Sequence, residues 1–135
     1  MLTDDLRAQL VQAAVSSRES AYTPYSNYKV GAALLTSTGK MYRGVNIENA
    51  AYPVTICAER VSVFKAVSEG EREFVAMAVV TSNGGFPCGS CRQVLAEFDL
   101  ETLIIIADEH GKVVGEATVG ELLPGAFGPE YLLAE

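Results

Sequence analysis

Three cysteines and one glutamate form two short motifs that could act together chemically. The first runs from Cys57 to Glu59 and the second from Cys88 to Cys91, directly after a proline. Cys88 and Cys91 are three residues apart, so the first turn of a helix places both sulfurs on one side. Thiolates in a tetrahedral arrangement favour zinc. The spacing therefore predicts one zinc ion per chain, bound by Cys57, Cys88 and Cys91.

The small number of possible ligands limits the type of zinc site. The chain has three Cys and one His, and His110 lies in an acidic turn where we expect a solvated loop residue. A structural zinc site has four protein ligands, whereas a catalytic site keeps one position for water. Three ligands without a fourth therefore predict catalysis. Taken alone, the Cys-x-x-Cys spacing also fits a redox pair or half of a structural zinc site.

Glu59 is the candidate catalytic residue. In the middle of a helix, a spacing of two would point Cys57 and Glu59 apart. At a first turn the ligand can lie outside helical geometry, so both can face the metal, and the carboxylate can move protons between water and substrate. The alternative is a glutamate that satisfies free N–H groups at the helix start. A ligand-x-Glu motif with a downstream Pro-Cys-x-x-Cys is typical of zinc deaminases, in which His usually takes the place of Cys57.

Two arginines directly follow the ligand motifs. Three thiolates give the zinc centre a net charge of about −1, so it acidifies water less well than neutral ligands would allow. We expect Arg60 to donate hydrogen bonds to the sulfurs and to withdraw charge from them. Arg92 either does the same or is an ordinary surface residue of a helix.

The apolar pattern predicts the elements that position these motifs. Thr3 is the expected N-cap of the first helix. A strand, helix and strand over 74–107 imply a right-handed crossover and parallel pairing. The predicted fold is α/β, a three-layer α/β/α sandwich with a mixed five-stranded sheet, in a single domain over 1–135. The expected helices span residues 4–20, 57–70, 88–97 and 119–123, and the expected strands span 28–34, 41–45, 74–80, 103–107 and a short polar segment after 111.

Composition excludes several classes of partner. The net charge is −7, and the ten Lys and Arg form no basic patch, which argues against nucleic acid and against an anionic membrane surface. No apolar stretch is long enough to span a bilayer. The first residues lack the basic start and apolar run of a signal peptide. We therefore expect a cytoplasmic protein whose thiols stay reduced.

The chain resembles the short, homotetrameric cytidine deaminases nearly from end to end. The resemblance implies a cytidine deaminase-like fold and zinc-dependent hydrolysis of cytidine and deoxycytidine to uridine and deoxyuridine, with release of ammonia, in pyrimidine salvage. The segments over residues 25–33 and 122–127 are not needed for zinc binding. Their match therefore distinguishes this family from zinc deaminases in general. The matching motifs are Tyr25-Ser26-x-Tyr28-x-Val30-Gly31-Ala32-Ala33, residues 46–53, Cys57-Ala58-Glu59-Arg60, residues 87–93 and residues 122–127.

The resemblance also implies substrate contacts. Asn46 and Glu48 are similar to the pair that holds the ribose hydroxyls, although the composition of the loop alone favours turn chemistry for both residues. Tyr28 is similar to an aromatic residue, often Phe, that packs on the pyrimidine; the alternative is a core strand residue. The Ala58 backbone is expected to contact the base edge. Phe127 is expected to reach a neighbouring subunit's pocket, or else to cap the core.

One residue departs from the family pattern. Phe86 precedes Pro87, where the family commonly has Ser. If only the carbonyl is used, the change is harmless; if the side chain shapes the pocket where the amine leaves, substrate preference shifts. Gln93, like Arg60, is expected to contact the zinc ligands without binding the metal itself.

Three other functions remain open from the sequence. The first is a deaminase of another free nucleoside analogue or base, which Phe86 keeps possible. The second is a nucleic-acid editing enzyme, which the charge disfavours. The third is a non-catalytic module stabilised by a closed zinc site.

Overall fold

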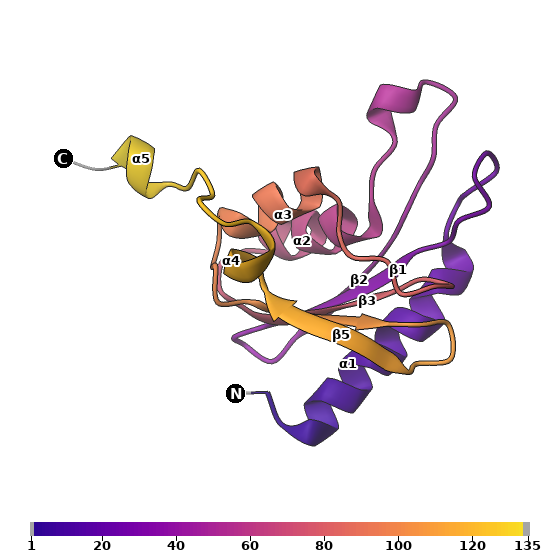
Figure 1. Cartoon of the computed structure of the whole chain (residues 1–135), viewed down its shortest axis with the longest axis horizontal. Helices are drawn as coiled ribbons and strands as arrows, with labels where there is room; N and C mark the ends of the chain where they lie inside the picture. The colour runs from indigo at the N-terminus through magenta and orange to yellow at the C-terminus, as the bar shows by residue number, and fades with distance from the viewer. Residues whose placement is uncertain (1, 134–135) are drawn as a thin grey trace.

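A mixed five-stranded sheet lies at the centre of the computed structural model, which describes residues 2–133 (Figure 1). Its strand order is β2-β1-β3-β4-β5. The pairing of β3 with β4 is parallel, as the sequence predicts, and the other pairings are antiparallel. The strands are β1 Gly31–Thr36, β2 Met41–Val45, β3 Phe74–Val80, β4 Leu103–Ala107 and β5 Val113–Thr118.

Helices cover both faces of this sheet, which confirms the three-layer prediction. Helix α1 (Asp4–Ser17) packs on one face, while α2 (Ala58–Ser68) and α3 (Gly89–Ala96) pack on the other (Figure 1). Strand β3 is apolar throughout because alternate residues enter opposite core clusters: Met77 packs under α2 and α3, and Ala78 packs under α1.

The predicted element boundaries need small corrections. Helix α1 is capped by Thr3, as expected, but it ends at Ser17 and continues as the 3-10 turn η1 Arg18–Ser20. Strand β1 begins at Gly31 instead of residue 28. The segment before it is held by a side chain, because the Asn46 amide bonds both the Val30 N–H and a neighbouring carbonyl. A side chain 16 residues away thus replaces part of the strand ladder.

Short elements complete the chain. The 3-10 turn η2 Tyr52–Val54 interrupts the irregular segment before α2. Helix α4 (Val119–Leu122) begins with a capping box between Thr118 and Glu121. Helix α5 (Glu130–Leu133), which the sequence pattern did not predict, ends the described chain. Within residues 2–133, no helix combines the length and the apolar character needed to cross a membrane.

The first turn of α2 is fixed by a close approach to β2. A Cβ atom on Gly44 would lie 2.3 Å from the Ala58 carbonyl oxygen and 2.6 Å from the Ser62 nitrogen. Only glycine therefore allows the start of α2 to come this near to the sheet. The approach sets the position of Cys57, which is the N-cap residue of α2.

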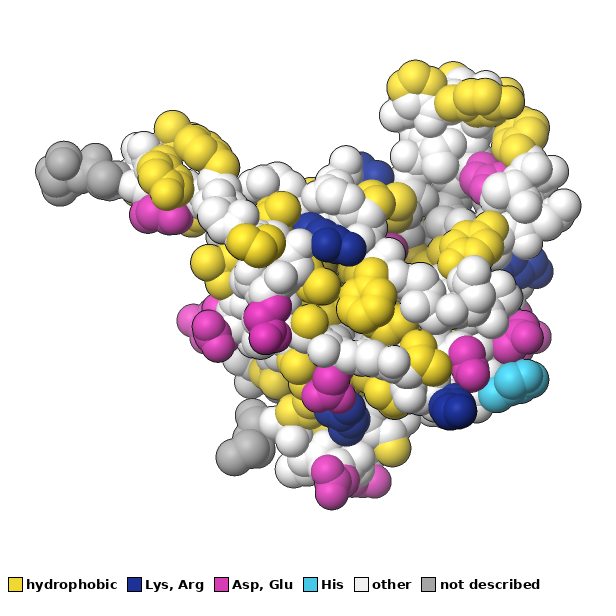
Figure 2. All heavy atoms as spheres, in the orientation of Figure 1, with side chains coloured by type: hydrophobic (Ala, Val, Ile, Leu, Met, Phe, Trp, Pro, Cys, Tyr) yellow, Lys and Arg dark blue, Asp and Glu magenta, His cyan; other side chains and the backbone are white. Residues whose placement is uncertain are grey.

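Two apolar segments project from the body on opposite sides (Figure 1). One is the loop that carries η2, where Tyr52 and Val54 are exposed; the other is the C-terminal arm from residue 125 to 133, where Phe127 and Tyr131 are exposed. Figure 2 shows hydrophobic side chains gathered on both projections. Exposed apolar groups of this kind often mark a surface that another protein covers.

Candidate active site

The three cysteine sulfurs lie together between the starts of α2 and α3. All three Sγ atoms lie within 4.8 Å of one another, with 3.8 Å from Cys57 to Cys88 and 3.6 Å from Cys88 to Cys91. Zinc–sulfur bonds of about 2.3 Å in a tetrahedron require sulfurs roughly 3.8 Å apart. Among residues 2–133, this is the one such group of His, Cys, Asp or Glu ligand atoms. The donor set therefore fits zinc.

Helix capping explains how the ligands converge. Cys57 is the N-cap of α2 and Cys88 is the N-cap of α3, and both have extended backbone angles (φ −80°, ψ 153° and φ −68°, ψ 169°). Cys91 follows in the first turn of α3 and is fully buried. The positive ends of two helix dipoles thus meet at the sulfurs, where they stabilise thiolates.

The protons within the cluster are unevenly shared. A hydrogen bond from the Cys91 thiol lowers the pKa of Cys57 to about 5, and Arg60 acts in the same direction. The pKa of Cys91 is raised, because its thiol donates the hydrogen bond to Cys57 and because the side chain is buried. The lowered pKa favours the thiolate form of Cys57, and a divalent cation would displace protons from the cluster as it binds.

The two arginines have different contacts. Arg60 Nη2 donates to Cys57 Sγ at 3.4 Å, which is the contact that its expected role requires. Arg92 instead donates to two carbonyl oxygens, at 2.7 Å to Pro87 and 2.8 Å to Leu122. Arg92 therefore ties the loop before Cys88 to the end of α4 and does not take the sulfur-bonding role.

Glu59 lies beside the sulfurs in a dry environment. Its side chain is 5% exposed, and it lines the same cavity as Cys57 and Cys88. Burial raises the pKa of its carboxyl to about 7, and the charge on Cys57 adds to this shift. A carboxyl that gains and loses a proton near neutral pH is suited to general acid–base catalysis.

The cavity in front of Glu59 has a volume of about 220 Å³. Glu59 is the one Asp, Glu, Lys or Arg among its lining residues, all within the described chain, so the cavity suits a neutral ligand better than a phosphorylated one. Two aromatic side chains, Tyr28 and Phe86, contribute to the wall. The lining comprises Tyr28, Val30, Asn46, Thr55, Ile56, Cys57, Glu59, Val79, Thr81, Gly85, Phe86 and Cys88.

Phe86 is held at this wall by the last strand. A Cβ atom on Gly115 of β5 would lie 3.1 Å from the Phe86 ring, so the ring packs directly over that glycine. The ring is therefore held against β5, next to the cavity that Phe86 lines.

Asn46 and Glu48 hold the neighbouring loops. The Asn46 Oδ1 atom accepts from the Val30 N–H at 2.9 Å, and its Nδ2 donates to the Tyr28 carbonyl at 2.8 Å. Glu48 Oε1 accepts from the N–H groups of residues 25–26 at 3.0 and 3.1 Å. A hydrogen bond from the Ser26 hydroxyl lowers the pKa of Glu48. These contacts match the loop-forming alternative, and only Asn46 lines the cavity.

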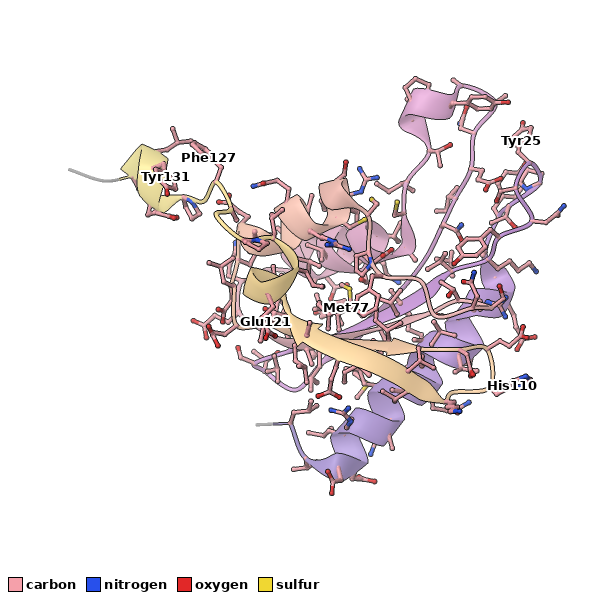
Figure 3. All side chains as sticks on the ribbon, viewed as in Figure 1. Tyr25, Met77, His110, Glu121, Phe127 and Tyr131 are labelled. Atoms are coloured by element: carbon pink, nitrogen blue, oxygen red, sulfur yellow. The ribbon has the colours of Figure 1, made fainter. Side chains whose placement is uncertain are left out.

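The remaining predicted residues lie at different depths. Ala58 is buried as the first residue of α2, where backbone N–H groups lack intrahelical partners. Gln93 Nε2 donates to the Phe127 carbonyl at 2.8 Å, so it holds the C-terminal arm and not a sulfur. Phe127 stacks on Tyr131 at 5.2 Å on that arm, which projects away from the cavity of its own chain (Figure 3). His110 is exposed in the turn before β5.

Several lining residues were not identified from the sequence. Thr55 and Ile56 directly precede Cys57, while Thr81 and Gly85 lie in the loop from β3 to Cys88. A topological signal could have found the second pair, because ligands bind beyond the carboxyl ends of parallel strands and β3 is such a strand.

Comparison with known proteins agrees with this geometry. Residues 5–107 match the family model described as the cytidine and deoxycytidylate deaminase zinc-binding region. A cytidine deaminase of Halalkalibacterium halodurans is 51% identical over 127 residues, which cover 92% of this chain and 96% of the relative. A cytidine deaminase of Mycobacterium tuberculosis is 41% identical over 132 residues, covering 96% and 92%.

Solved structures agree as well. The crystal structure of a cytidine deaminase from Burkholderia pseudomallei superposes with a TM-score of 0.84 at 45% identity, covering 88% of this chain and 97% of that one. The corresponding Mycobacterium tuberculosis structure gives 0.78 at 38% identity, covering 93% and 98%. The sequence match, the shared fold and the sulfur cluster agree, and the chain belongs to the cytidine and deoxycytidylate deaminase family.

Proposed function

We propose that this protein hydrolyses cytidine and deoxycytidine to uridine and deoxyuridine with release of ammonia, in a zinc-dependent reaction. The observation that carries this proposal is the buried Glu59 carboxyl, which lines one cavity with Cys57 and Cys88. The names of the relatives support the choice of substrate.

Cys57, Cys88 and Cys91 would hold the zinc ion, which supplies a Lewis acid that makes an attacking water more acidic. Glu59 accepts a proton from that water as the oxygen attacks C4 of the cytosine ring. The protonated carboxyl then donates this proton to N3. In the second half of the reaction Glu59 accepts the proton of the hydroxyl group now on C4 and delivers it to the exocyclic amine, while the C4 oxygen becomes the carbonyl of the product. The C4–N4 bond breaks, and ammonia leaves. Tyr28 and Phe86 line the cavity, and water that the bound substrate displaces from it would strengthen each charge interaction.

An ultraviolet assay of the purified chain, combined with a zinc count, tests this proposal. We expect loss of cytidine absorbance, one zinc per chain and matching ammonia release. Cytosine and guanine should react poorly. Turnover of a free base in preference to cytidine would instead support the alternative that Phe86 keeps open, and a zinc-loaded chain that deaminates none of these compounds would support a non-catalytic module.

Replacing Phe86 with serine tests whether its ring selects the substrate. Phe86 lines the cavity and its ring packs on Gly115, so we expect the serine variant to have a wider pocket. We expect kcat/KM for cytidine to fall about three- to tenfold, since the ring is only partly buried. The ratio of kcat/KM values for cytidine and cytosine should also fall. An unchanged ratio would show that only the backbone of residue 86 matters.

Replacing Arg60 with glutamine tests its effect on the sulfurs. The variant loses the charged donor to Cys57, so zinc should be retained roughly 10- to 100-fold less well and the pH optimum should rise. Zinc content after graded chelator treatment and the pH dependence of kcat measure both effects. Arg72→Gln is the matched control, because Arg72 donates to the carbonyls of Val67 and Glu71. Equal zinc retention in the two variants would remove this role.

We further infer a cytoplasmic homotetramer in pyrimidine salvage, with residues 1–135 acting as one catalytic domain. The reduced cysteines suit that compartment. The exposed side chains of the η2 loop and the C-terminal arm support assembly, because Phe127 lies on an arm that projects from the body of the chain (Figure 3). Sedimentation at four times the chain mass is the expected result, and a monomer that remains fully active would contradict it.

A further inference from the structure

The hydroxyl group of Tyr28, a residue that lines the cavity, is hydrogen-bonded to a distant loop. It lies 2.7 Å from Asn83 Oδ1, although the two residues are 55 positions apart in the sequence. Tyr28 precedes β1, and Asn83 lies in the loop that leads from β3 to Cys88. The hydrogen bond therefore joins Tyr28, which lines the cavity, to a loop whose residues Thr81 and Gly85 also line it.

Thr81 anchors this bond to the sheet. Its Oγ1 atom lies 3.3 Å from Asn83 Oδ1 and accepts from the Gly85 N–H at 2.9 Å. Thr81 is 3% exposed, directly after β3, so it is a fixed point. We call the connected set of Tyr28, Asn83, Thr81 and Gly85 the tyrosine tether.

Gly85 leaves the space that the tether needs. A Cβ atom on this residue would lie 2.9 Å from the Tyr28 hydroxyl oxygen, whereas its next contacts are at ordinary distances of 3.9 and 4.0 Å. The glycine has no positive φ angle, so alanine is acceptable to the backbone. The requirement for glycine here therefore comes from the tyrosine hydroxyl itself.

We propose that Asn83, Thr81 and Gly85 are positioning residues for the deamination, which hold the Tyr28 ring in one orientation at the cavity wall. This inference rests on the proposed function. Because the hydroxyl is already bonded at Asn83, the ring offers an apolar face to the cavity. Without the tether the Tyr28 ring is free to rotate. Substrate binding must then order the ring, and the loss of conformational entropy lowers the affinity. The effect falls on substrate affinity more than on the chemical step.

A double-mutant cycle on the bond tests the tether. Tyr28→Phe and Asn83→Ala should each raise KM for cytidine about three- to tenfold, the usual range for one net hydrogen bond, with kcat nearly unchanged. The double variant should have a KM no higher than that of the single variant with the higher KM, because both substitutions remove the same interaction. Tyr22→Phe, which removes the hydroxyl of an exposed tyrosine outside the cavity lining, is the matched control and should change neither constant.

A rescue experiment separates positioning from general damage. Gly85→Ala should raise KM about tenfold or more, since its methyl group displaces the Tyr28 hydroxyl. Adding Tyr28→Phe removes the oxygen that clashes, so the double variant should return to the KM of Tyr28→Phe alone. If the damage came from a part of the loop other than the contact with the Tyr28 hydroxyl, KM would not recover in this way.

The outcomes distinguish the tether from the proposed function. If the wild-type chain deaminates cytidine but the single effects add and Gly85→Ala is not rescued, the tether is wrong and the function stands. If the wild-type chain does not deaminate cytidine, the function is wrong. The unfolding temperature then decides the tether, because Gly85→Ala should lower it and Tyr28→Phe should restore it; no restoration overturns the tether.

Discussion

Replacing Glu59 with alanine is expected to reduce kcat for cytidine by about 10⁴-fold, the upper end of the range for loss of general acid–base catalysis. The loss is large because one carboxyl serves both the attack of water and the departure of the amine. Its burial and its pKa of about 7 allow it to hold the proton between these steps. Steady-state rates and a zinc count on the same sample measure the effect.

The three sulfurs should keep zinc in this variant, because Glu59 is not part of the cysteine cluster. Glu59→Gln preserves the shape of the side chain and should be equally inactive, which excludes a packing defect. Glu73→Ala, an exposed glutamate before β3, is the control and should retain full activity. Substantial turnover by a zinc-loaded Glu59→Ala protein would reject the assignment.

Replacing Cys88 with alanine is expected to remove the metal and the activity together, lowering kcat/KM by about 10³-fold or more. Cys88 is the sharper choice because its side chain is exposed, whereas Cys91 is fully buried and its loss would also leave a cavity. Metal content measured by mass spectrometry and the deamination rate should fall in parallel. Ser90→Ala, in the same turn, is the matched control.

The unfolding temperature should follow the metal. Zinc that binds the folded chain adds stability by mass action, so chelation should lower the wild-type midpoint and leave Cys88→Ala unaffected. If Cys88→Ala kept zinc and turnover, the sulfur cluster would not be the metal site.

The sheet and its covering helices could be predicted because their signals are local. Strands β3 and β4 are unbroken apolar runs, which suit a sheet covered on both faces. The cysteine cluster could be predicted for the same reason: Cys88 and Cys91 lie within one helical turn, and each motif begins a helix.

Features that depend on distant contacts could not be predicted. The start of β1 is set by the Asn46 amide, and the tether needs Tyr28 and Asn83 side by side. Neither contact produces a periodic pattern of residue types from which it could be predicted. The Arg92 contacts are of the same kind, because a helix residue next to Cys91 could equally face the sulfurs or the carbonyl of Leu122. Only the packing of α3 against α4 decides between them.

Zinc X-ray absorption spectroscopy of the purified, untreated chain tests the central claim most directly. The account predicts one zinc per chain with three sulfur neighbours at about 2.3 Å and one lighter oxygen neighbour from solvent or substrate. A fourth ligand from the protein, fewer than three sulfurs, or a chain that binds no zinc would contradict it.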